Sequence, residues 1–341
     1  MKEVINMKHI LCSGERKLES ETTIHLGPHT YEVDQNWLKW PEELPANVVL
    51  NAVWASDGFL YAVTGKKEYP VVVFDKDGNY VRKMAEGEFM KSHAISETKE
   101  HTFLIMDSRA HVAKEIDAEG NALRTWGTWD VPSDTGYDTE AWAKMEPLGL
   151  KPVETKWNHN PASNAKFQSV VRRGEPFNTP CAMIQAPDGE YYAADGYGNC
   201  AVHRFNKEGE LIQSWGEPGT EYGQFRVVHS AVIDKHNRIW ISDRENGRVQ
   251  CFTRDGELLA VADGNLSRIG NCTVDNDYLY IGELDGGITI IDLDTLECAG
   301  QAGAMKTFMR THGISMDAEG NLYTCSNNWN PNNIIKYTKV K

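Results

Sequence analysis

The sequence predicts an all-β fold, a six-bladed β-propeller. Two observations carry this prediction: one unit recurs six times, and each copy consists of short runs of alternating apolar and polar residues between glycine turns. Equivalent first residues of the copies lie 41 to 48 residues apart, except for one gap of 88 residues. These six lead residues are Asn51, His93, Cys181, His229, Asn271 and His312.

The copy that begins at His229 shows the unit most clearly. One alternating stretch runs to Asp243, and a second runs to the Asp-Gly turn at Gly256. Such runs form short antiparallel strands, and a unit of about 40 residues holds the four strands of one propeller blade. A toroidal repeat of this kind is one domain even in a chain of 341 residues.

The single long gap lies between the second and third copies. It spans about two periods, and we interpret it as an insertion of roughly residues 128–179 between blades 2 and 3. Its tryptophans, Trp129, Trp142 and Trp157, suit either a lid or an interface.

The two ends of the chain are expected to share the last blade. The sixth copy ends early, at Thr338, and an alternating stretch at 29–33 stands alone before the first copy. Closing a propeller normally joins such ends, so residues near 29–35 should form the outer strand of the sixth blade. The chain then divides into an N-terminal arm, 1–28, and a propeller, 29–341.

Composition narrows the classes of partner. The formal net charge is −14, and no dense cluster of Lys and Arg suggests binding to a phosphate backbone, so nucleic acid is not expected. The sequence shows neither a signal-peptide core nor an apolar stretch near 18 residues, which predicts a cytoplasmic protein without a membrane partner. Seven cysteines without a Cys-x-x-Cys pair suit reduced thiols.

Three of the lead residues are histidines in alternate copies: His93, His229 and His312. Alternate blades of a six-bladed ring are a third of a turn apart, so the three imidazoles would face one point on the axis. Three imidazoles with an open position are the ligand set of a catalytic zinc, which polarises a carbonyl or lowers the pKa of a bound hydroxyl. We therefore expect zinc, or another divalent transition metal, at the centre.

A loop 14 residues after each lead residue should return to the same face of the propeller. Two of these loops continue with Tyr197 and Arg244. The spacing therefore predicts that Tyr197 and Arg244 join the three histidines. The residues at the 14-residue position in four copies are Asp107, Asp195, Asp243 and Ser326.

Several motifs resemble those of the peptidyl-α-hydroxyglycine α-amidating lyases, especially bacterial members, within the NHL-repeat propellers. The resemblance is tight over about 176–256 and looser over 45–335. The motifs are Asp195-Gly-Tyr-Gly-Asn199, Trp215-Gly-Glu-Pro-Gly219, Gly223-Gln-Phe225, His229-Ser230 and Asp243-Arg-Glu-Asn-Gly-Arg-Val-Gln-Cys-Phe252.

The resemblance implies a lyase that cleaves a carbinolamide to an amide and glyoxylate. It implies that zinc is held by His93, His229 and His312, with Tyr197 as base and Arg244 beside it. An unperturbed phenol has a pKa of ~10, so nearby cations would have to favour the ionised form. An ion pair with a neighbouring acid, Asp243 or Glu245, is the structural alternative for Arg244.

Three positions depart from the family pattern. Lys66 replaces an arginine, so a charge remains but planar bidentate binding of a carboxylate does not. Arg310 stands where animal enzymes have methionine, which would add a cation for an acidic substrate group. Lys66 and Arg310 are thus predicted to bind substrate. Gly313 replaces an aspartate that ligates calcium in animal enzymes, so structural calcium is not expected.

The function predicted from these residues is a metal-dependent C–N lyase acting on a small α-hydroxyglycine-like substrate. Two alternatives remain. One is a lactonase-type propeller hydrolase, although that site normally uses Glu, Asp and Asn ligands on the axis. The other is a non-catalytic NHL-repeat propeller that binds a ligand or a protein through its open face.

Overall fold

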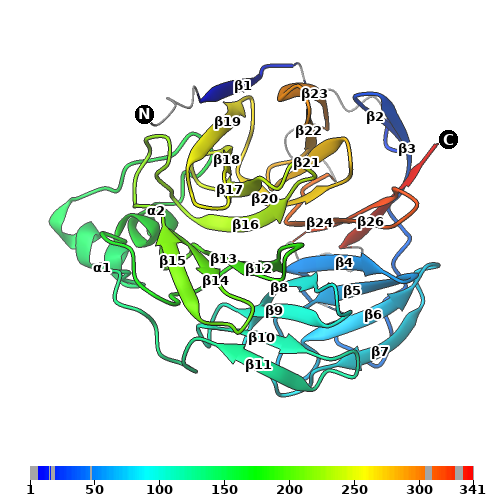
Figure 1. Cartoon of the computed structure of the whole chain (residues 1–341), viewed down its shortest axis with the longest axis horizontal. Helices are drawn as coiled ribbons and strands as arrows, with labels where there is room; N and C mark the ends of the chain where they lie inside the picture. The colour runs from blue at the N-terminus through cyan, green and yellow to red at the C-terminus, as the bar shows by residue number, and fades with distance from the viewer. Residues whose placement is uncertain are drawn as a thin grey trace.

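A computed structural model describes residues 7–14, 16, 20–46, 48–303, 309–326 and 333–340. Within these ranges the strands form six sheets arranged around a central axis (Figure 1). Neighbouring strands along the chain pair antiparallel in every blade. The predicted all-β, six-bladed propeller is confirmed.

Blades 1 to 3 are four-stranded sheets whose first strand is innermost. Blade 1 contains β4 (Ala52–Ser56), β5 (Phe59–Val63), β6 (Val71–Asp75) and β7 (Tyr80–Met84). Blade 2 contains β8 (Ser92–Glu97), β9 (Phe103–Asp107), β10 (Val112–Ile116) and β11 (Ala122–Trp126). Blade 3 contains β12 (Ala182–Gln185), β13 (Tyr191–Asp195), β14 (Ala201–Phe205) and β15 (Leu211–Trp215).

Blades 4 and 6 each gain strands from the N-terminal part of the chain. Blade 4 contains β16 (Val228–Ile233), β17 (Ile239–Asp243), β18 (Arg248–Phe252) and β19 (Leu258–Gly264), with β1 (Lys8–Cys12) added in parallel. Blade 5 contains β20 (Ile269–Val274), β21 (Tyr278–Glu283), β22 (Ile288–Asp292) and β23 (Glu297–Ala302). Blade 6 contains β24 (Gly313–Met316), β25 (Leu322–Cys325), β26 (Ile334–Lys339), β3 (His29–Asp34) and β2 (Thr23–Leu26).

The ends of the chain meet in blade 6. Strand β3 pairs antiparallel with β26, with Tyr31 opposite Lys339 and Asp34 opposite Lys336. The predicted closure of blade 6 by residues near 29–35 is confirmed, but β3 is not the outermost strand, because β2 pairs along its other edge. Strands β1 and β2 show that the segment before residue 29 also pairs with the blades.

A recurring Asp-x-x-Gly-Asn turn explains how adjacent strands reverse so tightly. In the turn from β10 to β11, the carboxylate of Asp117 accepts hydrogen bonds from the backbone N–H groups of Glu119, at 3.0 Å, and Asn121, at 2.8 Å. Gly120 between them has φ of +97°, a conformation that only glycine adopts freely. The sequence motif therefore encodes the hairpin directly.

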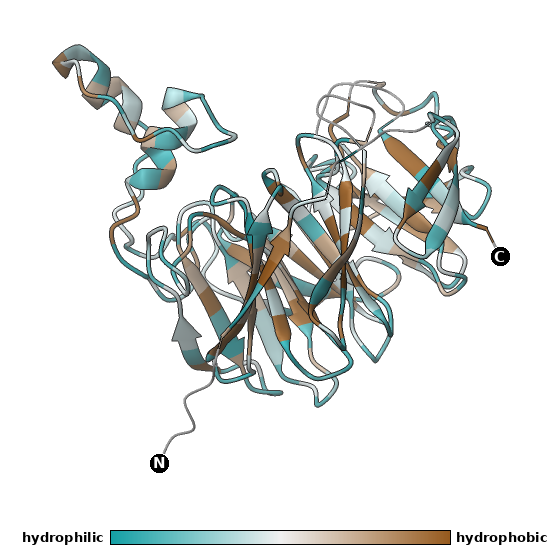
Figure 2. Cartoon of the chain, turned by 90° about the horizontal axis from the view of Figure 1, so that it is seen from above, coloured by the Kyte–Doolittle hydropathy of each residue, from teal (hydrophilic) through white to brown (hydrophobic). Residues whose placement is uncertain are grey.

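The insertion between β11 and β12 carries the helices. These are α1 (Ala141–Met145), the 3₁₀ helix η1 (Glu146–Leu148) and α2 (Pro161–Gln168). They project beyond one end of the blades in the side view of Figure 2. Helix α2 begins with Pro161 and is capped by the Asn160 side chain, which accepts from Ser163 N–H. No helix in the described ranges is long and apolar enough to cross a membrane.

Candidate metal centre

The three histidines meet at the propeller axis. His93 and His229 lie at the start of the inner strands β8 and β16, and His312 immediately precedes β24. All three are buried, with ring centroids 4.8 to 5.4 Å apart. One ring nitrogen from each lies within 4.8 Å of the others, so the structure brings together the residues that the repeat predicts.

Each imidazole is oriented by a backbone carbonyl of the next blade. His93 Nδ1 lies 2.8 Å from the carbonyl oxygen of Cys181, His229 Nδ1 lies 3.2 Å from that of Gly270, and His312 Nδ1 lies 2.6 Å from that of Asn51. A carbonyl only accepts, so each Nδ1 carries the proton and each Nε2 keeps a free lone pair. Metal-binding histidines are typically held in this way.

The strand register also turns the histidines inward. The pairing of β8 with β9 shifts between Ser92 and Ala94, and that of β16 with β17 shifts between Val228 and Ala231. His93 and His229 fall within these two irregularities. A bulge of this kind redirects a side chain that regular alternation would place elsewhere.

The acids 14 residues after the lead residues have a structural role. Asp107 accepts hydrogen bonds from Met90 and Lys91 N–H, Asp195 from Asn178 N–H, and Asp243 from Arg226 N–H. Each donor segment includes the residue three positions before a lead residue. The fixed spacing thus reflects a carboxylate that anchors the loop leading into the inner strand.

Tyr197 lies against the histidine cluster. Its hydroxyl is 3.1 Å from His93 Nε2 and 3.1 Å from His229 Nε2. A Cβ on Gly196 would lie 2.0 Å from the carbonyl oxygen of Val228, so glycine lets this loop pass close to β16. The single hydroxyl proton can serve only one of the two unprotonated Nε2 atoms. The cluster therefore has more acceptors than donors.

Arg244 contacts both Tyr197 and a neighbouring acid, Glu245. Its Nη1 donates to the Tyr197 hydroxyl at 2.8 Å, and its Nε lies 3.2 Å from Glu245 Oε1. The Glu245 contact has ion-pair distance but not hydrogen-bond geometry, since both atoms lack a hydrogen-bond partner. The other neighbouring acid, Asp243, pairs instead with Arg248 at 2.7 Å. Arg244 is therefore held by Glu245 and aimed at Tyr197.

Burial dominates the proton affinities at this site. It lowers the pKa of His93 to about 4 and the pKa of His229 and His312 well below the usual value for histidine. Burial also raises the pKa of Tyr197 to about 12, and the charge of Arg244 opposes that rise without cancelling it. The three rings are thus neutral near pH 7, and the phenol remains protonated unless more positive charge lies near it.

This donor set fits a divalent transition metal. Three neutral imidazoles present lone pairs to one point, and their other nitrogens are fixed by carbonyls. Zinc commonly takes such nitrogen ligands and leaves one position open in catalytic sites. The ligand atoms of this cluster are the ring nitrogens of His93, His229 and His312. Such nitrogen ligands suit zinc better than calcium, which prefers oxygen ligands.

A cavity of about 530 Å³ opens beside the histidines and is lined by His93, His312 and Tyr197. Lys66 lines it, and its role in binding substrate stays a prediction. Arg310 is not among the lining residues, and its Nε donates to the carbonyl of Leu284 at 3.2 Å. Lys66 is therefore a lining residue of this cavity and Arg310 is not, and the role of Arg310 also stays a prediction.

The cavity has further lining residues that the sequence analysis did not identify. They are Lys91 beside β8, and Tyr137, Lys166 and Phe167 from the insertion. Phe167 stacks on Tyr197, with ring centroids 6.1 Å apart and planes inclined by 27°. Lys91 lies two residues before His93, so the repeat register could have indicated it. The insertion lies outside the repeat, so no repeat register indicates that Tyr137, Lys166 and Phe167 lie at the cavity.

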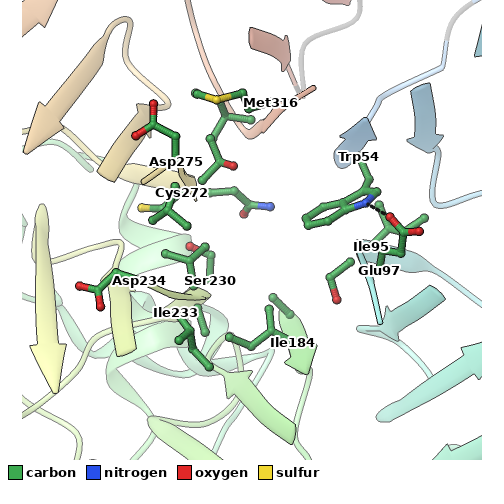
Figure 3. Close-up of a pocket in the computed structure, with 18 of the residues that line it drawn as sticks. Trp54, Ile95, Glu97, Ile184, Ser230, Ile233, Asp234, Cys272, Asp275 and Met316 are labelled. Carbon is green, nitrogen blue, oxygen red and sulfur yellow. Dashed lines mark hydrogen bonds between the residues drawn. The ribbon is translucent and has the colours of Figure 1, made fainter. Parts of the chain in front are cut away.

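A larger cavity, of about 830 Å³, lies among other residues (Figure 3). It is lined by the later parts of the inner strands, including Ile95, Ser230 and Met316, and by Trp54, whose Nε1 donates to Glu97 at 3.2 Å. Its lining includes none of the three histidines, Tyr197 or Arg244. Size therefore does not locate the candidate site.

Comparison with known proteins supports an NHL-repeat propeller. The NHL repeat family matches residues 225–252, a segment that contains His229 and Arg244. A gluconolactonase from Xanthomonas campestris has a similar fold, with a TM-score of 0.60 over 96% of this chain and 98% of its own. Its sequence is only 11% identical, so this likeness concerns the fold alone.

Two similar sequences differ in how much of the chain they cover and in whether their names state an activity. NHL repeat-containing protein 3 of Mus musculus is 24% identical over 75% of this chain and 67% of its own length. Peptidyl-alpha-hydroxyglycine alpha-amidating lyase 2 of Drosophila melanogaster is 32% identical over 45% of this chain and 37% of its own length. Together with the six blades, these matches show an NHL-repeat propeller that resembles the peptidyl-α-hydroxyglycine α-amidating lyases.

Proposed function

We propose that this protein is a metal-dependent C–N lyase. Its substrate is a small carbinolamide, R–CO–NH–CH(OH)–COO⁻, which it splits into R–CO–NH₂ and glyoxylate. The C–N bond breaks with its electron pair passing to nitrogen, the hydroxyl proton is removed as C=O forms, and nitrogen takes up one proton. The observation that carries the proposal is the contact of Tyr197 with two of three clustered imidazoles and with Arg244.

The bound metal would supply Lewis-acid chemistry, polarising an oxygen of the substrate. Among the chain's own residues, Tyr197 is positioned to receive the hydroxyl proton and return a proton to the leaving nitrogen. Arg244 donates to the same phenol oxygen and favours its ionised form. Because burial raises the pKa of Tyr197 to about 12, the proposal requires positive charge besides Arg244 beside that oxygen.

Phe167 and the other insertion residues at the cavity define the non-reacting side of the substrate site. The ring of Phe167 covers one side of Tyr197, which limits water at the reacting hydroxyl. The cavity of about 530 Å³ lies within the range of small-molecule sites. We therefore propose a small N-acyl or N-carbamoyl α-hydroxy acid, rather than a long peptide, as substrate.

A non-catalytic NHL propeller is the second candidate. The match to NHL repeat-containing protein 3 covers more of the chain than the lyase match does, so the wider sequence similarity concerns the repeat and not an activity. A scaffold, however, has no need for three buried, unprotonated imidazole nitrogens beside a tyrosine and an arginine. Burying such polar groups costs stability unless they are fully paired, and a binding surface elsewhere would not compensate this cost.

The test is glyoxylate release from N-acetyl- and N-carbamoyl-α-hydroxyglycine. Tyr197→Phe should lower kcat about 100-fold or more while metal content stays the same, because only the proton-transfer group is lost. Tyr222→Phe makes the same chemical change at a tyrosine outside this cavity and should leave kcat near the wild-type value. Full activity in Tyr197→Phe would overturn the proposed role of this residue.

A further inference from the structure

Three lysines converge on the cavity beside the histidines. Lys66 comes from the loop between β5 and β6, Lys91 from the segment leading into β8, and Lys166 from helix α2 of the insertion. All three line the same cavity as Tyr197. The chain as a whole has a formal net charge of −14, so this is a basic site in an acidic protein.

The lysines face no acidic partner in the described parts of the chain. Among the described residues that line the cavity, none is Asp or Glu. The ion pairs found within the described ranges include neither Lys66, Lys91 nor Lys166; Lys166 Nζ instead lies over the Phe167 ring, 5.5 Å from its centroid. Their charges are therefore available to a ligand.

The fourth cation near the cavity, Arg244, is already engaged. Its guanidinium contacts the Tyr197 hydroxyl and the Glu245 carboxylate, which in turn accepts from Asn158 Nδ2 at 2.8 Å. A metal held by the histidines would account for the carboxylate at the reacting end of an α-hydroxy acid. The three lysines add positive charge beyond what one carboxylate needs.

Crowding of like charges makes an anionic ligand favourable here. Lys166 is partly buried, and burial together with the charges of Lys91 and Arg244 lowers its pKa. An anion between these groups would relieve the repulsion. Lys66 and Lys91 are exposed, so solvent and salt screen part of their attraction for it, whereas Lys166 is partly buried. Lysine suits this role because it binds a carboxylate or a phosphate as a point charge.

We infer that the substrate of this site carries a second anionic group, on the amide side of the bond that breaks, and that Lys66, Lys91 and Lys166 bind it. The inference rests on the proposed function, since it assigns the first carboxylate to the reacting end. A carboxylate and a phosphate share the chemistry that these lysines recognise. The substrate class is thus a dianionic N-acyl-α-hydroxyglycine.

Binding of unreactive analogues tests this inference without turnover. N-succinylglycine carries a second carboxylate, N-(phosphonoacetyl)glycine carries a phosphonate, and N-butanoylglycine carries neither. Calorimetric titration should show that at least one dianion binds about tenfold or more tightly than N-butanoylglycine, the scale of a hydrogen bond between charged groups. The tighter of the two dianions distinguishes a carboxylate from a phosphate site.

Two variants assign the effect to the lysines. Lys166→Met keeps an unbranched side chain, one atom shorter, but removes its charge, and should reduce the preference for the dianion about tenfold. Lys151→Met removes one charge from an exposed part of the insertion outside the cavity and should retain the preference. Equal binding of all three analogues, or an unchanged preference in Lys166→Met, would overturn the inference.

Turnover separates this inference from the proposed function. The matching α-hydroxy compounds should release glyoxylate, with a higher kcat/KM for the dianions. Glyoxylate release at equal rates from dianion and monoanion retains the lyase and refutes the dianionic substrate. Preferential binding of the dianionic analogues without glyoxylate release from any substrate would refute the lyase and support the lysine site.

Discussion

At the scale of single residues, the candidate site depends on where protons lie. A backbone carbonyl fixes the Nδ1–H tautomer of His93, His229 and His312, so that each Nε2 is left as an acceptor. A buried acceptor without a donor is unfavourable, and one hydroxyl, that of Tyr197, cannot satisfy all three. A bound cation would remove this deficit, which links the local hydrogen bonding to the proposed metal.

The low pKa of His93 predicts how the metal-free protein responds to acid. Its pKa falls from 6.5 to about 4 on folding, so the unfolded chain binds more protons between these values. Stability is therefore complete above about pH 6.5 and declines as the pH falls toward 4, by up to about 3 kcal/mol from this residue. Urea unfolding of chelator-treated protein at pH 7.5 and 5.0 measures the difference, and equal stability at the two pH values would contradict it.

The anchoring acids predict a second residue-scale effect. The carboxylate of Asp107 accepts from the N–H groups of Met90, Lys91, Arg109 and Ala110. Asp107→Ala should cost about 2–3 kcal/mol in the free energy of unfolding and lower metal content, because His93 follows the loop that loses its anchor. Asp117→Ala, in an exposed turn, provides the control and should retain metal. Normal metal content in Asp107→Ala would show that the loop positions His93 without it.

At the scale of elements, the insertion extends the site beyond the repeat. Asn158 donates to Glu245, and Thr135 donates to the carbonyl of Gly198 at 2.6 Å, which ties the insertion to the loops that carry Arg244 and Tyr197. The lid interpretation of this segment is therefore favoured over an interface alone, since Phe167 reaches the ring of Tyr197.

Removing the ring of Phe167 should impair catalysis more than folding. Phe167→Ala opens one side of Tyr197 to water, and we expect kcat/KM for glyoxylate release to fall about tenfold. Leu148→Ala changes a side chain of the same insertion that is 73% exposed, and it should have little effect. Equal activity in both variants would show that helix α2 does not shape the reacting site.

At the scale of the whole molecule, closure of the ring completes the candidate site. The bond from His312 to the carbonyl of Asn51 joins blade 6 to blade 1, and blade 6 depends on β3 from the other end of the chain. Three of the six blade boundaries are thus bridged by a histidine, and one of these boundaries belongs to blade 6, the blade in which the chain ends meet. Folding and site formation should therefore be coupled.

A substitution in the closing strand tests this coupling. Tyr31 in β3 is fully buried, and Tyr31→Ala should destabilise the protein by about 3–5 kcal/mol and weaken metal retention. Leu11→Ala in β1, at a side chain that is 58% exposed, should change stability by less than about 0.5 kcal/mol. Thermal unfolding with metal analysis measures both effects. Unchanged metal retention in a destabilised Tyr31→Ala would separate closure from the site.

What the sequence could predict follows from the repeat. Six copies with a common register identify the blades, the closing strand and the meeting of His93, His229 and His312 on one axis. The same register predicts that Tyr197 and Arg244 lie beside the three histidines, and the structure places Arg244 against Tyr197. The constant spacing of the acids in those loops has another cause, since Asp195 accepts a backbone hydrogen bond from Asn178. Zinc as the bound metal, the cytoplasmic location and the roles of these residues stay predictions.

Other features were hidden because nothing in the sequence fixes their register. The insertion has no copy elsewhere in the chain, so Lys166 and Phe167 could not be placed beside the histidines. Strand β1 pairs in parallel with β19 across more than 240 residues, and short exposed runs of this kind carry no signal of their partner. Arg310 Nε donates to the backbone carbonyl of Leu284, a contact that the sequence does not indicate.

The most direct test of the central claim is glyoxylate release by protein whose metal has been removed and then restored. Chelator-treated protein should be inactive yet folded, and one equivalent of zinc per chain should restore activity to wild-type protein but not to His229→Ala. Full activity in the metal-free protein, or restoration of His229→Ala by one equivalent of zinc, would contradict a lyase that depends on this histidine centre.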